Sequence, residues 1–294
     1  MNKNHESSII VVVGPTASGK SDFAITLALQ HNGEIISADS RQVYKGLDLG
    51  TGKITKKETK GVPHHMLDVY ELDEEVSVAR YARDATPILR DILSRGKTPI
   101  ICGGTGQYID ALIYDSSLPK VPPNTKLREE FEKKNSEELF ELLQKKDSVR
   151  AGSVDKHNRV RIIRALEIVE SLGVVPQQKI PALIYQTTIY LMSPTRELLR
   201  TRITARLEKR LKQGMLEEVK EVLEKAESLY GQATSNVIRK FGLEYVTLSK
   251  YLDGTLTEES MKKELITKSM QYAKRQQTWN KKYLPFATIV EVKE

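Results

Sequence analysis

The segment Gly14–Ser21 reads GPTASGKS and fits the pattern G-x-x-x-x-G-K-[ST]. It follows the apolar run 9–13, which predicts a buried strand, and it opens a stretch of helical periodicity at 20–31. In this context the two glycines let the backbone curl so that successive N–H groups point at an anion. Lys20 adds a positive charge, and Ser21 offers a hydroxyl to Mg²⁺. We therefore predict a phosphate-binding loop between a strand and a helix.

All residues of this loop are predicted contacts to a diphosphate: Gly14, Pro15, Thr16, Ala17, Ser18, Gly19, Lys20 and Ser21. A loop of this type recognises the diphosphate and not the group attached to it. Kinases, hydrolases and transferases all use it, many of them with ATP or another nucleotide. Other segments of the chain must therefore decide which compound is bound.

Strand and helix patterns alternate over the first 115 residues. Strands are expected at 9–13, 33–37 and 98–102, and helices near 20–31, 78–94 and 106–114. Strands that are separated by helices form parallel sheets. We predict an α/β fold, with a P-loop NTPase-like parallel sheet flanked by helices.

The sequence pattern changes at Leu118, and this change indicates a second domain. The proline-rich stretch 118–124 is followed by charged amphipathic helices to about Leu172. Later patterns predict a strand at 187–192, a long helical stretch at 195–226, a last helix at 258–282 and a strand at 287–290. We predict a catalytic core formed by residues 1–117 and 186–294, and a helical insertion domain formed by residues 118–185.

Basic residues are concentrated in the second part of the chain. Residues 1–115 carry 13 Lys and Arg against 15 Asp and Glu, whereas residues 116–294 carry 33 against 24. A basic surface attracts nucleic acid through the release of counterions. The same composition is also typical of a solvated, lysine-rich helical surface. RNA is therefore a candidate partner that charge alone does not establish.

The single cysteine, Cys102, excludes an intramolecular disulfide and is expected to be a small buried residue. No window has the apolar length needed to span a bilayer, and residues 1–8 lack the features of an export signal. We expect a cytoplasmic protein without a membrane anchor. We also expect a monomer, although no sequence feature fixes the oligomeric state.

Two further segments follow predicted strands and carry polar side chains. Asp39 comes after strand 33–37, and Thr105 lies in GGTG after strand 98–102. Ligands of open α/β sheets bind at the carboxyl ends of strands, so both residues should lie near the phosphate loop. Asp39 could take a proton from a nucleophile, but it could also be a magnesium carboxylate or a helix cap. Thr105 could touch phosphate or metal, or its glycines could only make a tight turn.

Seven motifs, in order along the chain, resemble those of a known family. They are GPTASGKS at 14–21, SADSRQVY at 37–44, HHMLD at 64–68, SVAR at 77–80, GGTG at 103–106, RIIRALE at 161–167 and YAKRQQTW at 272–279. Together they resemble the tRNA dimethylallyltransferases, also called tRNA isopentenyltransferases. The resemblance covers nearly the whole chain.

The resemblance implies transfer of a dimethylallyl group from dimethylallyl diphosphate to N6 of an adenosine in tRNA. The adenosine is position 37, on the 3′ side of the anticodon, in tRNAs that read codons beginning with U. Asp39 would orient N6 and take its proton, and Thr105 would lie beside the reaction centre. Lys20 and Mg²⁺ would neutralise the diphosphate leaving group, with Ser21 and Thr105 as the metal ligands.

The resemblance also implies the RNA contacts, because the adenine must be flipped out of the anticodon loop to react. The matching positions are Asp39, Ser40, Arg41, Gln42, Thr105, Lys126, Arg159, Val160, Arg161, Ile162, Ile163 and Arg164. A solvated arginine stripe would show the same spacing at Arg161 and Arg164. One arginine near the diphosphate corresponds to Arg202 or Arg206, and their four-residue spacing does not choose between them.

Other parts of the matching motifs have weaker functional implications. Adjacent histidines rarely share one metal, so we interpret His64 and His65 as structural. Lys274 and Arg275 lie beside Trp279 and could meet phosphates and a stacked base, although a tryptophan on an amphipathic helix is more often part of a core.

The chain departs from the family pattern at four places. The usual GTAKP is GTGKI at 50–54, the usual GLY after GGT is GQY at 106–108, IGYKE is FGLEY at 241–245, and the usual Asp-Pro is Asp147-Ser148. None of these changes touches the diphosphate loop or Asp39.

Three other functions remain open from the sequence. A small-molecule kinase would use the same loop with ATP, and a non-catalytic RNA-binding protein would keep only the basic half. An adenylate isopentenyltransferase would share the core but act on free AMP. The helical insertion and its arginines favour a large RNA substrate.

Overall fold

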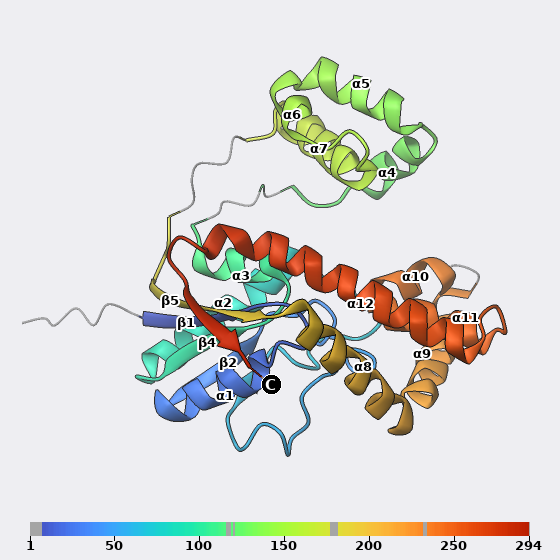
Figure 1. Ribbon diagram of the computed structural model, residues 1–294. Coiled ribbons are helices and arrows are strands. Elements are labelled where there is room, and N and C mark those ends of the chain that lie inside the picture. The colour runs from blue at the N-terminus through green and yellow to red at the C-terminus, as the bar shows by residue number, and fades with distance from the viewer. Residues whose placement is uncertain (1–7, 116–118, 120, 177–181, 232–233, 294) are drawn as a thin grey trace, which may run out of the picture. The chain divides into compact units, whose positions relative to one another are not determined.

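The computed structural model describes residues 8–115, 119, 121–176, 182–231 and 234–293. Two compact units are formed, one by residues 1–114 and 183–294 and the other by residues 115–182. The larger unit contains the sheet, and the smaller one is helical (Figure 1). The predicted domain boundary at 117/118 lies outside the described residues, and the one at 185/186 lies three residues after the boundary between the units.

The larger unit is built on one parallel sheet of six strands among the described residues. The strands are β1 (Ser8–Val13), β2 (Gly33–Ser37), β3 (His64–His65), β4 (Thr98–Cys102), β5 (Gln186–Pro194) and β6 (Thr288–Val292). Their order is β3-β2-β4-β1-β5-β6, and every neighbouring pair is parallel. The predicted α/β fold with a parallel sheet is therefore confirmed.

Alternate residues of β1 face two different cores, as the period of a strand requires. Ile9, Val11 and Val13 pack with α2 (Val78–Ser94) and α3 (Gly106–Ile113). Ile10 and Val12 pack on the other face with α1 (Lys20–Gln30). A continuous apolar run is typical of a strand that is covered on both faces by helices.

The boundaries of α2 follow from its terminal residues. The Ser77 side chain accepts the N–H of Arg80 at 3.2 Å and so caps the first turn. Gly96 has φ 70°, a conformation that glycine adopts without strain and that turns the chain away from the helix axis. The helix predicted at 78–94 is therefore confirmed at both ends.

The region after β5 holds more helices than the sequence pattern predicted. They are α8 (Arg196–Lys212), α9 (Met215–Tyr230), α10 (Thr234–Phe241), α11 (Leu243–Leu252) and α12 (Glu258–Asn280), and a short 3₁₀ turn at Lys281–Tyr283 follows. The helical stretch predicted at 195–226 is confirmed, but it is divided into α8 and α9 at Gly214, which has φ 99°. Strand β3 and helices α10 and α11 were not predicted.

The smaller unit contains α4 (Thr125–Glu132), α5 (Ser136–Lys146), α6 (Ser148–Ser153) and α7 (Arg159–Leu172). Its own apolar core includes Phe131, Leu139, Leu143, Ile162 and Leu166. At the junction of α5 and α6, the Asp147 carboxylate accepts the N–H of Arg150 at 2.8 Å and that of Val175 at 2.8 Å. The aspartate of the family's Asp-Pro thus stabilises this unit even though serine follows it.

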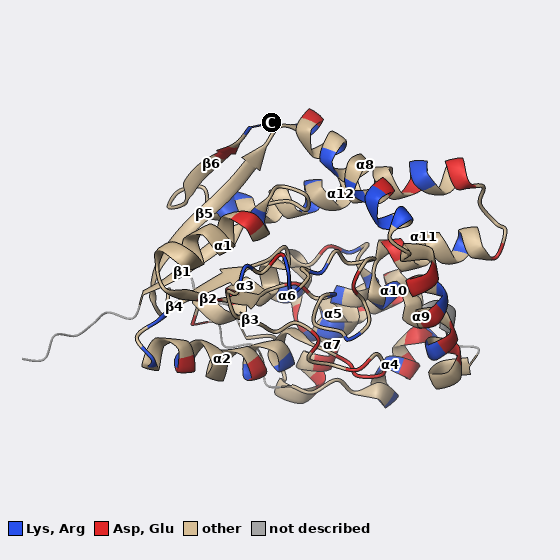
Figure 2. Cartoon of the chain, turned by 90° about the horizontal axis from the view of Figure 1, so that it is seen from below, with Lys and Arg blue, Asp and Glu red and all other residues tan. Residues whose placement is uncertain are grey.

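Charged residues of both signs are mixed along the helices. α2 and α9 carry Lys and Arg together with Asp and Glu, whereas α8 carries mostly Lys and Arg with two glutamates (Figure 2). The excess positive charge of the second half is therefore spread over surfaces that also carry carboxylates.

Among the described residues, no helix combines the length and the hydrophobicity that crossing a membrane would require.

Candidate active site

The loop after β1 has the backbone of an anion-binding turn. Gly14 has φ 153° and Gly19 has φ 85°, and Ala17 adopts a left-handed φ of 60°. A Cβ on Gly14 would lie 2.7 Å from the Cβ of Met192 on β5, so the close approach of the loop to β5 requires glycine. α1 starts at Lys20, directly after this turn. The N–H groups of its first turn form the positive end of the helix dipole, which favours a bound anion.

Lys20 is held inside this loop. Its Nζ donates a hydrogen bond to the carbonyl oxygen of Pro15 at 2.6 Å. The pKa of Lys20 is lowered to about 8, mainly by burial. Cys102 and Asp39 oppose this shift, and the charge of Arg206 contributes to it. A bound diphosphate would favour the protonated form, because an opposite charge stabilises it.

The two candidate arginines of α8 both reach this loop. Arg206 donates from Nη2 to the hydroxyl of Thr16 at 2.8 Å. Arg202 places Nη1 3.7 Å from the position of a Cβ on Gly19, and its Nη2 donates to the carbonyl of Lys293 at 3.0 Å. The half-buried Arg206 thus bonds the loop directly, and Arg202 lies beside it. Which of the two contacts the diphosphate stays a prediction.

Strands β2 and β4 end side by side next to β1. Ser37 is in register with Cys102, which is in register with Val12. The carboxyl ends of three neighbouring strands therefore meet at one edge of the sheet. The phosphate loop, the segment after β2 and the turn after β4 all start from this edge.

Asp39 and Thr105 are brought together at this edge. The N–H of Ser40 donates to Thr105 Oγ1 at 3.0 Å, and the N–H of Thr105 donates to the carbonyl of Ala38 at 3.0 Å. A Cβ on Gly103 would lie 2.1 Å from that carbonyl oxygen, so only glycine permits this contact. The glycines therefore make the tight turn that the sequence analysis considered. In the same turn, the Thr105 hydroxyl accepts a hydrogen bond from the main chain of Ser40.

The two oxygens of the Asp39 carboxylate differ in their hydrogen bonds. Its Oδ1 accepts the N–H of Arg41 at 2.9 Å and that of Gln42 at 3.3 Å. Within the described part of the chain, no hydrogen bond is formed to Oδ2. Burial lowers the pKa values of Lys20 and Arg206, and the negative charge of Asp39 partly opposes both shifts. Asp39 therefore caps a turn and not a helix, because no helix follows β2 in this segment. Its role toward a substrate stays a prediction.

Arg41 and Gln42 extend this segment toward the helical part of the unit. Arg41 donates to the carbonyl of Lys240, and Gln42 Nε2 lies 3.3 Å from the carbonyl of Gly52. Both side chains thereby hold neighbouring loops in place.

Arg210 and Glu244 form a buried charged group that the sequence did not reveal. Burial lowers the pKa of Arg210 to about 9, and the charge of Arg206 adds to the shift, while the carboxylate of Glu244 opposes it. Burial raises the pKa of Glu244, and the two arginines act against the rise. Glu244 stands where the family pattern has lysine, so this chain carries a carboxyl close to Arg206 and to the buried Arg210.

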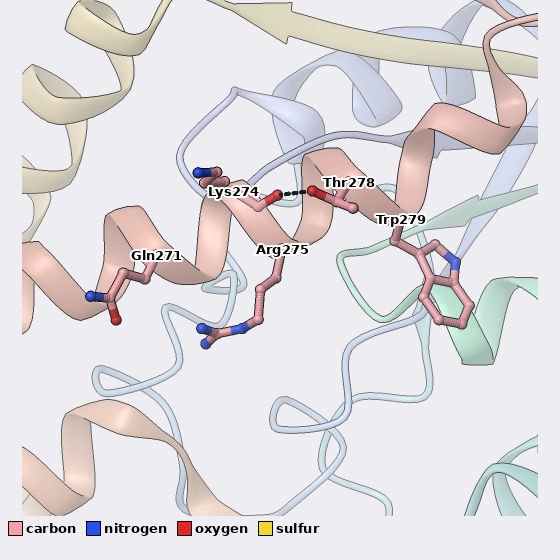
Figure 3. A pocket seen from close by; sticks show the side chains of 5 residues that line it. All are labelled: Gln271, Lys274, Arg275, Thr278 and Trp279. Atoms are coloured by element: carbon pink, nitrogen blue, oxygen red, sulfur yellow. Dashed lines mark hydrogen bonds between the residues drawn. The ribbon is translucent and has the colours of Figure 1, made fainter. Parts of the chain in front are cut away.

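A basic face of α12 lines a hollow of about 530 Å³. Gln271, Lys274, Arg275 and Thr278 lie along one side of the helix, and Trp279 lies at its end (Figure 3). The two cations are exposed. Trp279 is half-buried and packs against Gly106, where a Cβ would lie 2.0 Å from Nε1. Trp279 is therefore mainly a packing residue, while Lys274 and Arg275 are exposed, with the Arg275 guanidinium 5.6 Å from the centroid of the Tyr272 ring.

The predicted RNA-binding residues of the smaller unit differ in exposure. Lys126, Val160 and Arg161 are exposed, Val160 by 77%. Ile162 and Ile163 are buried in the core of the unit, so their side chains offer no surface to RNA.

Two more of the predicted RNA-binding residues, Arg159 and Arg164, make hydrogen bonds within the smaller unit. Arg159 donates to the carbonyl of Phe131 at 2.7 Å, and Arg164 donates to that of Val121 at 2.7 Å. Arg164 also meets the buried carboxylate of Glu167 at 3.2 Å. Both side chains are therefore partly used to hold the unit together.

The donor set at the sheet edge fits a magnesium ion that is bound chiefly by a diphosphate. Ser21 and Thr105 offer hydroxyls, and no group of three or more His, Cys, Asp or Glu forms a metal cage among the described residues. Mg²⁺ keeps several waters and is usually bound through one or two protein groups and substrate phosphates. His64 and His65 are bonded instead to the carbonyl of Val62 and the carboxylate of Glu34, each at 2.8 Å, in agreement with a structural role.

Comparison with known proteins identifies the family. A model of the family described as IPP transferase matches residues 42–283. The tRNA dimethylallyltransferase of Anoxybacillus flavithermus is 41% identical over 282 residues, which are 94% of this chain and 88% of that protein. The chain belongs to the tRNA dimethylallyltransferase family. The enzyme of that name from Enterococcus faecalis is 37% identical, with 92% of this chain and 87% of that protein covered.

Solved structures of this family share the fold. A full-length tRNA isopentenylpyrophosphate transferase from Bacillus halodurans has a TM-score of 0.70 and 33% identity, with 97% of this chain and 90% of that one covered. A eukaryotic dimethylallyltransferase acting on tRNA has a TM-score of 0.85 and 26% identity, with 98% and 74% covered. Membership of the tRNA dimethylallyltransferase family makes the chain a prenyltransferase and disfavours the kinase and the non-catalytic binding protein.

Proposed function

We propose that this chain transfers a dimethylallyl group from dimethylallyl diphosphate to N6 of adenosine 37 in tRNAs that read codons beginning with U, and releases diphosphate. The single observation that carries the proposal is the meeting of Asp39, Thr105 and the phosphate loop at one edge of the sheet. This arrangement supplies a diphosphate site and a carboxylate acceptor side by side. The named relatives, which act on tRNA, favour this acceptor over free AMP.

The positive groups of the loop support departure of diphosphate. An allylic carbon–oxygen bond ionises readily once the charge of its leaving group is neutralised. The phosphate loop gathers several positive groups: Lys20, the loop N–H groups and Arg206. Arg202 lies beside Gly19 of the same loop. Mg²⁺, when bound between the diphosphate and the hydroxyls of Ser21 and Thr105, would supply further neutralisation.

The free oxygen of Asp39 supports activation of the acceptor. An exocyclic adenine amine is a weak nucleophile and must lose a proton as the new bond forms. Asp39 Oδ2 is available for that proton because Oδ1 alone makes the backbone bonds. Thr105 holds the Asp39 segment in place through its bond to Ser40 and would lie beside the reacting carbon.

Exposed residues on each unit support binding of RNA. Lys126, Val160 and Arg161 offer a basic and an apolar contact on the smaller unit, and Lys274 and Arg275 offer two cations on α12. Ser40, Arg41 and Gln42 follow Asp39 and would line the site of the flipped base. Arg159, Ile162, Ile163 and Arg164 would support the contact by holding α7 in shape.

The donor is tested by thermal protection. Dimethylallyl diphosphate with Mg²⁺ should raise the unfolding temperature of the protein, because a ligand that binds only the folded state stabilises it. Lys20→Met should abolish the rise, whereas substitution of the exposed Lys56 by Met should leave it unchanged. Protection by ATP in place of dimethylallyl diphosphate would contradict the proposal and favour a kinase.

A further inference from the structure

We propose that Gln276 is a positioning residue that holds the phosphate loop and the turn after β4 in the geometry that binds diphosphate. The inference rests on the proposed function, because it concerns the same diphosphate site. Gln276 lies on α12 and is 260 positions away from Thr16 in the sequence. It belongs to the YAKRQQTW segment, in which only Lys274, Arg275 and Trp279 suggested a role.

Gln276 makes one hydrogen bond to each of the two loops. Its Oε1 accepts the N–H of Thr16 at 2.7 Å, and its Nε2 donates to the carbonyl of Gly104 at 3.1 Å. A main-chain N–H can only donate and a carbonyl can only accept, so these partners fix the orientation of the amide. One side chain therefore connects the turn that carries Thr105 to the loop that carries Lys20.

The burial of Gln276 makes both hydrogen bonds necessary. The buried residues of α12 recur every three or four positions, as Met261, Leu265, Ser269, Ala273, Gln276 and Asn280. Gln276 is only 6% exposed, and a primary amide at such a position is costly unless it is hydrogen-bonded. A Cβ on Gly104 would lie 2.0 Å from Nε2, so the amide also depends on glycine in the turn.

Thr16 is consequently held from two sides. Gln276 binds its main-chain N–H, and Arg206 binds its hydroxyl at 2.8 Å. A loop that is ordered before the ligand arrives loses less entropy on binding. Loss of the Gln276 bonds should therefore weaken diphosphate binding and leave RNA binding unaffected.

Three variants separate this role from a general effect on the fold. Gln276→Met keeps the length of the side chain and removes both hydrogen bonds. Gln276→Asn keeps a polar amide that is too short to reach both loops. Gln277→Met is the matched control, because Gln277 is the next residue of the same helix and is exposed. The measurements are calorimetric binding of inorganic diphosphate with Mg²⁺, the KM for dimethylallyl diphosphate with kcat, the Kd for tRNA and the unfolding temperature.

Gln276→Met should raise the Kd for inorganic diphosphate by about tenfold, the effect of losing two ordinary hydrogen bonds. KM for dimethylallyl diphosphate should rise with it, while the tRNA Kd and the unfolding temperature stay near wild type. Gln276→Asn should show a smaller rise, and Gln277→Met none.

A wild-type diphosphate Kd in folded Gln276→Met, or an equal loss of tRNA affinity, would overturn the inference. If the Met variant does not fold, the Asn variant decides by the same criterion. Failure of the proposed function is distinguishable, because wild-type protein would then bind diphosphate without modifying tRNA. The diphosphate Kd of the variants would still test Gln276 in that case.

Discussion

The two carboxylate oxygens of Asp39 differ in their contacts, since Oδ1 accepts two backbone N–H groups and Oδ2 accepts no hydrogen bond among the described residues. Asp39→Asn keeps an acceptor for the two backbone N–H groups but removes the base. We expect turnover to fall by about two orders of magnitude or more, the usual scale for a general base. Single-turnover kinetics measures the loss, and the tRNA Kd should stay nearly unchanged.

Asp39→Ala provides the comparison for this variant. It removes the carboxylate and its hydrogen bonds to the turn together, so it should show the same loss of turnover and a lower stability, by about 1 kcal/mol, the net value of an ordinary hydrogen bond. An equal loss of tRNA affinity in both variants would instead make Asp39 a binding residue.

Lys20 should give diphosphate binding a characteristic pH dependence. Its pKa in the free protein is lowered to about 8 by burial, and an anion binds the protonated form. Below pH 8 the lysine is charged and affinity is high. Above pH 8 affinity should fall, by up to about tenfold per pH unit, because a proton must be taken up on binding. Calorimetry with dimethylallyl diphosphate from pH 7 to pH 9.5 measures this.

Lys20→Met is the control for the pH profile. This variant should bind weakly at every pH and show no fall of affinity between pH 8 and pH 9.5. A fall of the wild-type size in Lys20→Met would assign the titration to another group.

Single residues were predictable where a local motif specifies them. Lys20 and Thr105 follow from loop patterns that act within a few positions. The contact between Arg206 and Thr16 and that between Gln276 and Thr16 join positions 190 and 260 apart. Pairing over such distances depends on tertiary packing, which spacing along one helix does not contain.

At the scale of elements, α7 offers a test of RNA binding. Arg161 is exposed near the start of α7, whereas Arg164 donates to the carbonyl of Val121 and meets Glu167. Arg161→Ala should weaken tRNA binding and lower the slope of log K against log salt by about one, as expected for the loss of one phosphate contact. Filter binding at several salt concentrations measures the slope.

Arg164→Ala is the informative comparison. It should mainly lower the stability of the helical unit, because it leaves the buried Glu167 with fewer partners. A salt slope that is unaltered in Arg161→Ala would place Arg161 away from the RNA.

The break between α8 and α9 is a test of backbone conformation. Gly214 has φ 99°, and a Cβ there would meet only Glu217 Oε2, at 3.6 Å. Gly214→Ala should therefore destabilise the protein by about 1 kcal/mol or more through backbone strain alone. Urea denaturation measures the loss, with Gly152→Ala as control because Gly152 lies in α6 without a positive φ. Equal stability of the two variants would contradict this explanation.

Elements were predictable in proportion to the length and regularity of their patterns. Strand 9–13 and helix 78–94 have strong periodicity and clear boundaries, and both were found. The two-residue β3 carries no period to detect. The 195–226 stretch keeps apolar residues at helical spacing across Gly214, and the only sign of the break was the glycine itself after a basic last turn.

At the scale of the whole molecule, the sheet order explains why distant motifs share one site. β2, β4 and β1 are neighbours, so the residues after them meet at the carboxyl edge. This rule holds for open parallel sheets in general, which is why the sequence alone predicted the place of the site. The packing of α8 and α12 against the phosphate loop was not predictable, because it joins residues far apart in the chain.

The central claim is transfer of the dimethylallyl group to the adenine beside the anticodon. The measurement is incubation of the protein with labelled dimethylallyl diphosphate, Mg²⁺ and either tRNA or AMP, followed by digestion and nucleoside mass analysis. A tRNA with guanosine at position 37 and the Asp39→Asn variant serve as controls. We predict label on adenosine 37 of tRNA, none on AMP or on the tRNA with guanosine 37, and label that forms about a hundredfold more slowly with Asp39→Asn. Label on AMP, or on tRNA that lacks adenosine 37, would contradict the account.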